Sequence, residues 1–154
     1  MTSAPSTDTT ARSPRSRRRL IRLAAVVLGI TLVLSGCLNA GSRQSQDMVN
    51  ASRRVRGLPA LSSNLSLAVK AQNWAEYLAR RGSLAHSNLA SGVPYRWRAL
   101  AENVGYGSSV SSVHGQFMRS SRHRANILGR FNYIGTGVAY GRGRVWVVQV
   151  FMLY

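Results

Sequence analysis

Acidic residues are scarce in this chain of 154 residues, which has four of them against 21 lysines and arginines. From Cys37 onward there are three acidic residues against 15 basic ones, so the balance stays strongly basic. Such a surface is attracted to polyanions such as phospholipid head groups, anionic wall polymers and nucleic acids. The arginines are scattered, with no recognition-helix pattern and no aromatic-interleaved strand. We therefore expect no specific nucleic-acid binding and interpret the surface as one that faces an anionic envelope.

Cysteine is nearly absent as well, because Cys37 is the only one in the chain. No intramolecular disulfide can form, although exported domains often use them, so core packing alone must hold the domain together. A lone cysteine can be a catalytic nucleophile. Cys37 follows a hydrophobic segment and has no histidine near it in the sequence. This position favours a lipid anchor instead.

The hydrophobic run at residues 23–34 is too short to span a membrane, since it has twelve residues and a spanning helix needs about 20. It follows an arginine-rich stretch and suits a secretory signal. Leu-Ser-Gly-Cys at 34–37 resembles a bacterial lipobox, and Ser-Arg-Arg-Arg-Leu-Ile-Arg at 16–22 resembles a twin-arginine signal. An uncleaved signal anchor is the alternative. In either case we expect an extracytoplasmic domain anchored to the cell membrane.

These signals divide the chain into three parts. We interpret residues 1–36 as a lipoprotein-type signal peptide, residues 37–45 as a lipidated linker and residues 46–154 as one folded domain. The patterns in the domain predict three helices, at 46–56, 65–81 and 109–120. They also predict three strands, at 99–104, 134–140 and 145–152. The middle helix is expected to begin at an Asn64 cap and to end at Gly82. Its predicted buried face contains Leu67, Ala71, Trp74, Ala75 and Leu78.

Glu102 lies between two of the three histidines, His86 and His123, in a domain that has few other carboxylates. A neutral imidazole and a carboxylate can share a proton or together hold a divalent metal. The alternative is that each of these side chains only satisfies its own backbone neighbours. We expect His114, in mid-helix, to be a surface or partly buried residue outside the site, and Asn103 to fix the turn after its strand. Neither a Gly-x-Ser-x-Gly elbow nor a complete dinucleotide fingerprint occurs.

Several segments of the domain occur in an order typical of one superfamily. They are Asn50 with Arg53, Gly-Leu-Pro-Ala-Leu at 57–61, a helix with Ala71, Trp74 and Ala75, His86, Glu-Asn-Val at 102–104, Ser-x-x-His-Arg-Ala-Asn-Ile-Leu at 120–128, Ile-Gly-Thr-Gly-Val-Ala at 134–139, and Trp-Val-Val-Gln-Val-Phe at 146–151. Together they resemble the bacterial branch of the CAP superfamily, which includes cysteine-rich secretory proteins, insect venom antigens and plant pathogenesis-related proteins. The resemblance covers roughly residues 44–154. It implies an α/β fold, a three-layer α-β-α sandwich with a small, mostly antiparallel central sheet.

The resemblance also bears on the candidate site. In the family, residues at the places of His86, Glu102 and His123 line a shared surface cleft. This implies that His86 and His123 can hold a divalent metal such as zinc, with Glu102 either as a ligand or as the group that orients the imidazoles. The family's fuller site has a second glutamate near the place of Ser120. This chain lacks it, which weakens the metal interpretation.

For function, the resemblance favours a binding protein of the cell envelope and leaves open whether the protein is also an enzyme. Its ligand would be a lipid, a metal or an anionic envelope component, bound in the cleft or on the basic surface. The alternative is a metal-assisted hydrolase acting on envelope peptides or esters, for which the sequence offers no dedicated nucleophile beyond the serines near His123. We expect a monomer attached to the membrane through lipidated Cys37.

Overall fold

The computed structural model of the chain describes residues 39–93 and 96–154. The interpretation of residues 1–36 as a signal peptide and the predicted lipidation of Cys37 concern residues outside this part, so both stay predictions. Among the described helices, none combines the length and the hydrophobicity needed to cross a membrane.

Helix α2 spans Ala40–Arg54 and begins six residues before its predicted start. The Oδ1 atom of Asn39 caps it by accepting a hydrogen bond from the Ser42 backbone N–H at 2.8 Å. Residues 40–45, predicted as linker, are therefore helical. Ser42 and Ser45 are small enough to pack directly against the sheet and are 0% and 1% exposed. The sequence of this first helical turn is as polar as that of a linker, which is why the prediction missed it.

Helix α3 spans Leu65–Arg81, as the sequence predicts. Asn64 caps it through a 3.1 Å hydrogen bond from the Leu67 backbone N–H, and Gly82 ends it with a left-handed φ of 80°. Trp74, predicted to lie in the core, is only partly buried, so that prediction is wrong. It lies at the border of the buried face, where its indole N–H reaches the segment that follows the helix. The fully buried residues of that face are Leu67, Ala71, Ala75 and Leu78.

Four strands of the described chain form one mixed sheet in the order β1-β3-β4-β2. They are β1 (Ser62–Ser63), β2 (Ala99–Gly107), β3 (Tyr133–Gly141) and β4 (Arg144–Leu153). β2 and β3 both pair with β4 in antiparallel orientation, whereas the short β1 pairs with β3 in parallel. The mostly antiparallel sheet expected from the sequence is confirmed, and β3 and β4 are its two inner, largely buried strands.

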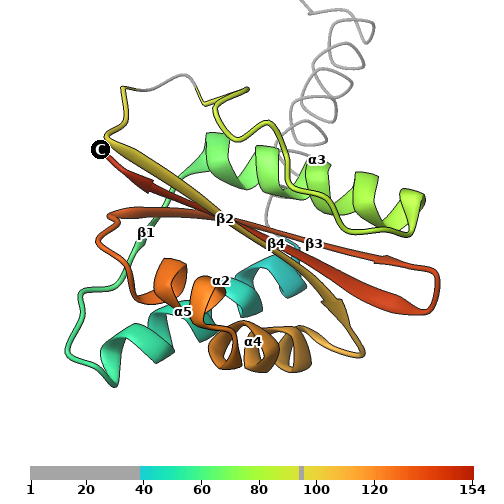
Figure 1. The fold of residues 1–154 in the computed structure, drawn as a ribbon, viewed down its shortest axis with the longest axis horizontal. Helices are drawn as coiled ribbons and strands as arrows, with labels where there is room; N and C mark the ends of the chain where they lie inside the picture. Colours follow the sequence, from blue (N-terminus) through green and yellow to red (C-terminus); the bar gives the residue numbers. More distant parts are fainter. Residues whose placement is uncertain (1–38, 94–95) are drawn as a thin grey trace, which may run out of the picture. The chain divides into compact units, whose positions relative to one another are not determined.

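Helices cover both faces of this sheet (Figure 1). α3 lies on one face, and α2, α4 (Val110–Arg119) and α5 (Ser121–Leu128) lie on the other. The predicted three-layer α-β-α sandwich is confirmed. Each pair of layers encloses its own apolar cluster, built around Leu67, Leu78 and Trp146 on the α3 side and around Val113, Phe117 and Phe151 on the opposite side.

Two glycines let α3 approach β3 closely. A Cβ atom added at Gly135 would overlap the backbone of Leu67, and one added at Gly137 would overlap the backbone of Ala71. No side chain, not even a methyl group, fits between helix and strand at these positions. The Gly-Thr-Gly run at 135–137 therefore sets the spacing between the first two layers.

A row of buried amides crosses the sheet on the side of α2 and α5. Asn126 Nδ2 donates to Asn103 Oδ1 at 2.9 Å, and Asn103 Nδ2 donates to Gln149 Oε1 at 3.1 Å. Gln149 Nε2 then donates to the Ser45 hydroxyl oxygen at 3.1 Å. Asn103 and Gln149 are both 0% exposed. Asn103 therefore joins elements in the middle of β2, and the interpretation that it fixes a turn after the strand is wrong.

Candidate functional site

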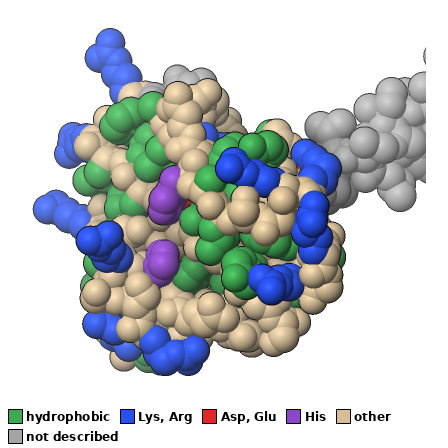
Figure 2. Space-filling model, turned by 45° about the vertical axis from the view of Figure 1, so that its right-hand side comes forward, with side chains coloured by type: hydrophobic (Ala, Val, Ile, Leu, Met, Phe, Trp, Pro, Cys, Tyr) green, Lys and Arg blue, Asp and Glu red, His purple; other side chains and the backbone are tan. Residues whose placement is uncertain are grey.

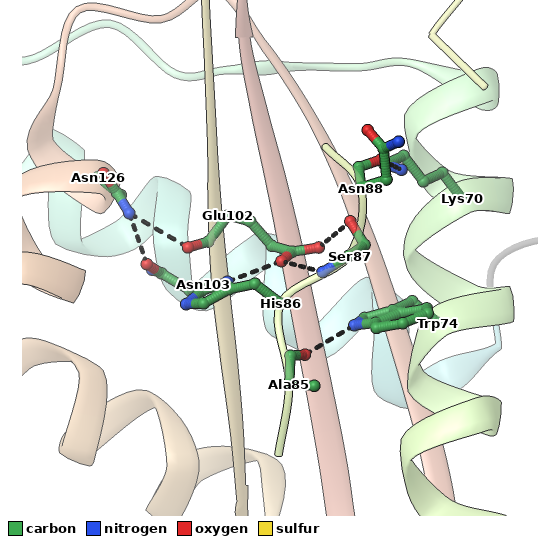
Figure 3. A network of polar contacts seen from close by, with 9 residues as sticks. All are labelled: Lys70, Trp74, Ala85, His86, Ser87, Asn88, Glu102, Asn103 and Asn126. Carbon is green, nitrogen blue, oxygen red and sulfur yellow. Dashed lines mark hydrogen bonds and ion pairs between the residues drawn. The ribbon is translucent and has the colours of Figure 1, made fainter. Parts of the chain in front are cut away.

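The carboxylate of Glu102 is held at both oxygens by two consecutive residues (Figure 3). Its Oε1 atom lies 2.7 Å from His86 Nδ1 and accepts the Ser87 backbone N–H at 2.9 Å. Its Oε2 atom accepts the Ser87 hydroxyl at 2.6 Å. The Glu102 side chain is 2% exposed, whereas the His86 side chain is 63% exposed. A buried carboxylate thus stands behind an imidazole that is open to solvent.

These contacts also set which nitrogen of His86 carries a proton. An ionised carboxylate only accepts hydrogen bonds, so the proton between the two groups belongs to Nδ1. In the neutral ring Nε2 then keeps the lone pair, which can accept a proton or bind a metal. Glu102 therefore determines the tautomer of His86 as well as its orientation.

Trp74 holds the start of the segment that contains His86. Its indole Nε1 donates to the Ala85 carbonyl oxygen at 2.9 Å (Figure 3), and its ring stacks on Tyr77 with the centroids 4.7 Å apart. The residue just before His86 is thereby tied to α3. The structural role of Trp74 is to position this segment rather than to fill the core.

Lys70, the only lysine of the chain, fastens the other end of the segment. Its ammonium donates to the carbonyl oxygens of Asn88 and Ser91, at 2.8 Å in each case. Burial lowers the pKa of Lys70, and the nearby Glu102 carboxylate offsets part of that shift. Lys70 therefore orders the backbone that follows Ser87 and places a positive charge near the buried carboxylate.

His123 lies in the first turn of α5, where the sequence suggested a turn after a helix. The helix was missed because Ser120 both ends α4 and precedes α5. The His123 ring packs on Phe117 with the centroids 5.0 Å apart. Burial lowers the pKa of His123, and the charge of His86 lowers it further. The second effect means that the two imidazoles lie within electrostatic range of each other.

A groove of about 510 Å³ lies beside His123. Leu84, Tyr106, Phe117 and Ser120 are among the residues that form its walls. Figure 2 shows two histidine side chains on one face of the domain, with hardly any acidic atoms in view and basic side chains around the edge. A ligand bound in this groove would meet the His123 imidazole and a partly aromatic wall. We refer to His86, Glu102, His123 and this groove as the histidine cleft.

For a metal, the arrangement suits two protein ligands better than three. Both oxygens of Glu102 are engaged by His86 and Ser87, so the carboxylate acts on the imidazole rather than on a cation. Within residues 39–93 and 96–154, no three His, Cys, Asp or Glu side chains converge as a metal site. The geometry therefore favours the orienting role for Glu102 and leaves His86 and His123 as the candidate ligands.

His114 lies away from this cleft, on the face of α4 that meets α2. Its Nε2 atom is 2.9 Å from the Ser52 hydroxyl, and the residue is 8% exposed, which is more buried than the sequence suggested. Its Nδ1 atom is buried without a hydrogen-bond partner in the described part of the chain. Burial lowers the pKa of His114, so the neutral ring is favoured in the folded state.

The stability of the domain is expected to fall when the solution is acidified below about pH 6.5. His114 and His123 both have a lowered pKa in the folded state, so the unfolded chain takes up their protons first. Each then contributes a loss that approaches about 1.4 kcal/mol per pH unit. His114→Gln should reduce the difference in unfolding free energy between pH 7.5 and pH 5.5, measured by urea denaturation. An unchanged difference would contradict the neutral, buried state of His114.

The sequence pointed to His86, Glu102 and His123, and the structure joins His86 to Glu102 directly and brings His123 near them. The sequence did not indicate the residues that hold these three side chains in place. Ser87 was detectable, since a hydroxyl next to a candidate histidine can share its carboxylate. Lys70 had no signal, because its partners are backbone atoms of a distant segment.

The fold agrees with the family that the sequence resembles. The family model of CAP, the cysteine-rich secretory protein family, matches residues 46–151. The chain therefore belongs to the CAP family. No curated protein matches it.

Solved structures share this fold at low sequence identity. An extracellular protein with an SCP domain from Bacillus anthracis matches with a TM-score of 0.66 and 21% identity, over 75% of this chain and 41% of that one. An outer surface protein from Borrelia burgdorferi gives 0.63 and 15%, over 72% and 90%. A venom allergen-like protein from Schistosoma mansoni gives 0.61 and 14%, over 75% and 90%. These likenesses show the fold alone, and this chain spans less than half of the Bacillus protein.

Proposed function

We propose that this CAP protein is displayed outside the cytoplasm and binds a ligand at the histidine cleft. The observation that carries the proposal is the contact between Glu102 and His86. The buried carboxylate holds the imidazole at 2.7 Å while 63% of the His86 side chain stays exposed. A fixed, exposed imidazole near a second one is suited to a divalent cation or an acidic head group.

The location is inferred from the leader. Its arginines, the apolar run at 23–34 and the following Cys37 favour export and lipid attachment to the membrane. Two of the similar structures come from an extracellular protein and an outer surface protein. A strongly basic domain at that location faces the anionic groups of the envelope.

Zinc is the cation that we propose for the cleft, because imidazole nitrogens are among its preferred ligands. His86 and His123 would supply two ligands, and the remaining positions would be open to water or to an oxygen of a second ligand. Burial helps to keep His123 neutral, as a metal ligand must be. The groove beside His123 has space for the apolar part of that second ligand.

Metal-assisted hydrolysis is the second candidate, because Ser120 lines the same groove as His123. Such an enzyme needs a base that can reach the substrate or an attacking water. Glu102 is 6% exposed and both of its oxygens are engaged, so it is badly placed for that role. Binding without turnover is the function that the geometry supports best.

Calorimetric titration of zinc into the purified protein tests the cleft. We expect binding at pH 7.5 that weakens about tenfold or more at pH 5.5, because protonation of imidazole competes with the metal. His86→Ala or His123→Ala alone should remove most of the affinity. Glu102→Gln should lower it less, since an amide oxygen still accepts the Nδ1 proton of His86.

The matched control is His114→Gln, which removes a histidine outside the cleft and should leave zinc affinity unchanged. Flat titration traces at both pH values would rule out the metal. A loss in Glu102→Gln as large as that in His86→Ala would make Glu102 a direct ligand and overturn the orienting role.

A further inference from the structure

A second hollow, which we call the α3 groove, runs along the outer side of α3. It has a volume of about 820 Å³ and lies between that helix and residues 87–93. Figure 1 shows the chain after α3 running back alongside the helix. The α3 groove shares no lining residue with the groove beside His123, so it is a separate site.

Large apolar side chains line the helix wall of the α3 groove although they are open to solvent. Leu65, Val69 and Tyr77 are 65%, 39% and 38% exposed. Their spacing of four and eight residues puts them on one side of the helix. Tyr77 also stacks on Trp74, with the ring planes 23° apart, and the exposed Arg81 guanidinium lies over the Tyr77 ring, 5.9 Å from its centroid. Apolar surface gathered in this way marks a place where another molecule binds.

Polar groups interrupt this apolar surface along the whole groove. Asn73, Asn88 and Ser91 are exposed lining residues, and their side chains form no hydrogen bond with another described residue. Lys70 is the only charged residue of the lining. Two of its three N–H groups are engaged by the backbone carbonyls of Asn88 and Ser91, so one is left for a ligand.

We propose that the α3 groove binds an acidic oligosaccharide. A sugar ring has an apolar C–H face that packs on an aromatic ring, and hydroxyl groups at its edge that pair with amides and hydroxyls. Tyr77 provides the first kind of surface when the exposed Arg81 side chain moves aside, and Asn73 and Asn88 provide the second. A carboxylate on the sugar meets the free N–H of Lys70, which selects an acidic glycan over a neutral one.

The distribution of polar groups decides between a glycan and an acyl chain. An acyl chain laid along Leu65, Val69 and Tyr77 would cover the amide of Asn73 and the hydroxyl of Ser91 without pairing with them. A polar group that loses water without gaining a partner lowers the affinity of the ligand that covers it. A saccharide satisfies these groups with its own hydroxyls, and the net positive charge of the domain favours an anionic one.

Calorimetric titration with a galacturonate tetramer and with its methyl ester tests the proposal on the purified protein. The two ligands have the same sugar backbone and differ in the charge of the carboxyl groups. We expect the acid to bind and the ester to bind more weakly. Tyr77→Ala should weaken both by up to about tenfold, because the aromatic ring that packs on the sugar is lost. Lys70→Gln should weaken binding of the acid more than binding of the ester, because it removes the charge that only the acid meets, whereas the loss of the hydrogen bonds to Asn88 and Ser91 affects both ligands.

Tyr140→Ala is the matched control, since Tyr140 is a tyrosine 71% exposed on β3, outside the groove, and its loss should change nothing. His86→Ala should also leave saccharide binding intact, so failure of the histidine cleft and failure of this site are distinguishable. Thermal unfolding confirms that each variant is folded. The proposal is overturned if neither saccharide binds, if Tyr140→Ala matches Tyr77→Ala, or if laurate displaces the acid and depends on Tyr77 in the same way.

Discussion

Replacing Arg53 with methionine is expected to lower the free energy of unfolding by about 3–5 kcal/mol. Arg53 is 2% exposed. Its guanidinium donates to the carbonyl oxygens of Pro59, Ile127 and Gly129 at 2.8, 2.9 and 2.8 Å. Methionine fills most of the volume but donates no hydrogen bond, and each carbonyl left unpaired costs about 1–3 kcal/mol. Two of these carbonyls lie at the end of α5, so the helix that carries His123 should loosen as well.

Arg54→Met is the matched control, because the neighbouring side chain is exposed on the same helix. It should change the unfolding free energy by no more than about 0.5 kcal/mol. Urea denaturation of both variants measures the two effects. If Arg53→Met costs less than about 1 kcal/mol, other donors or water must replace the guanidinium, and Arg53 does not hold these segments together.

Gly137→Ala is expected to cost about 3 kcal/mol, the second large effect. The added methyl group would overlap the backbone of Ala71, which cannot rotate away as a side chain can. α3 would have to move off β3, and the apolar cluster between them would lose its close packing. Thermal and urea unfolding should both show the loss, and the affinity for the acidic saccharide should fall below that of the wild type if α3 shifts.

Replacing Gly115 with alanine should instead raise the free energy of unfolding. Gly115 lies within α4, and its nearest neighbour for an added Cβ is the flexible end of Arg119 at 3.4 Å. Alanine is the better helix former there, so Gly115→Ala should stabilise the protein by about 0.5–1 kcal/mol. Equal losses at Gly115 and Gly137 would mean that the close approach of α3 and β3 does not set the stability.

Elements whose signals are local could be predicted from the sequence. α3 has an asparagine cap, an apolar repeat and a final glycine, and its bounds match the prediction. The start of α2 was missed because its burial depends on serines that pack on a distant strand. α5 was missed because it is short and starts where α4 ends, so no polar loop separates them. Trp74 was placed in the core because its helical spacing does not reveal a hydrogen bond to Ala85.

The candidate site could be predicted only in part, because it too depends on contacts between residues that are distant in the sequence. The resemblance indicated His86, Glu102 and His123, but the distribution of contacts around Glu102 depends on where the segment after α3 crosses β2. Ser87 donates to both oxygens of the Glu102 carboxylate, and His86 contacts one of them. This leaves the two imidazoles as the candidate metal ligands. Lys70 and Trp74 place that segment through backbone carbonyls, which have no signature in the sequence.

The buried row from Asn126 to Ser45 has a direction. Asn103 and Gln149 each donate a hydrogen bond toward α2 and accept one from the side of α5, so all the hydrogen bonds of the row run in the same direction. Aspartate has nearly the shape of asparagine, yet at position 103 it would set two acceptors against each other at Gln149. Reversing the Gln149 amide would relieve that contact, because the Ser45 hydroxyl can rotate to donate. The aspartate would still face the carbonyl oxygen of His123, to which Asn103 Nδ2 donates at 3.2 Å, and a backbone carbonyl cannot become a donor. The row therefore tolerates a substitution at its α2 end far better than one in its middle. Asparagine and aspartate have nearly the same size, but they do not have the same hydrogen-bond donors.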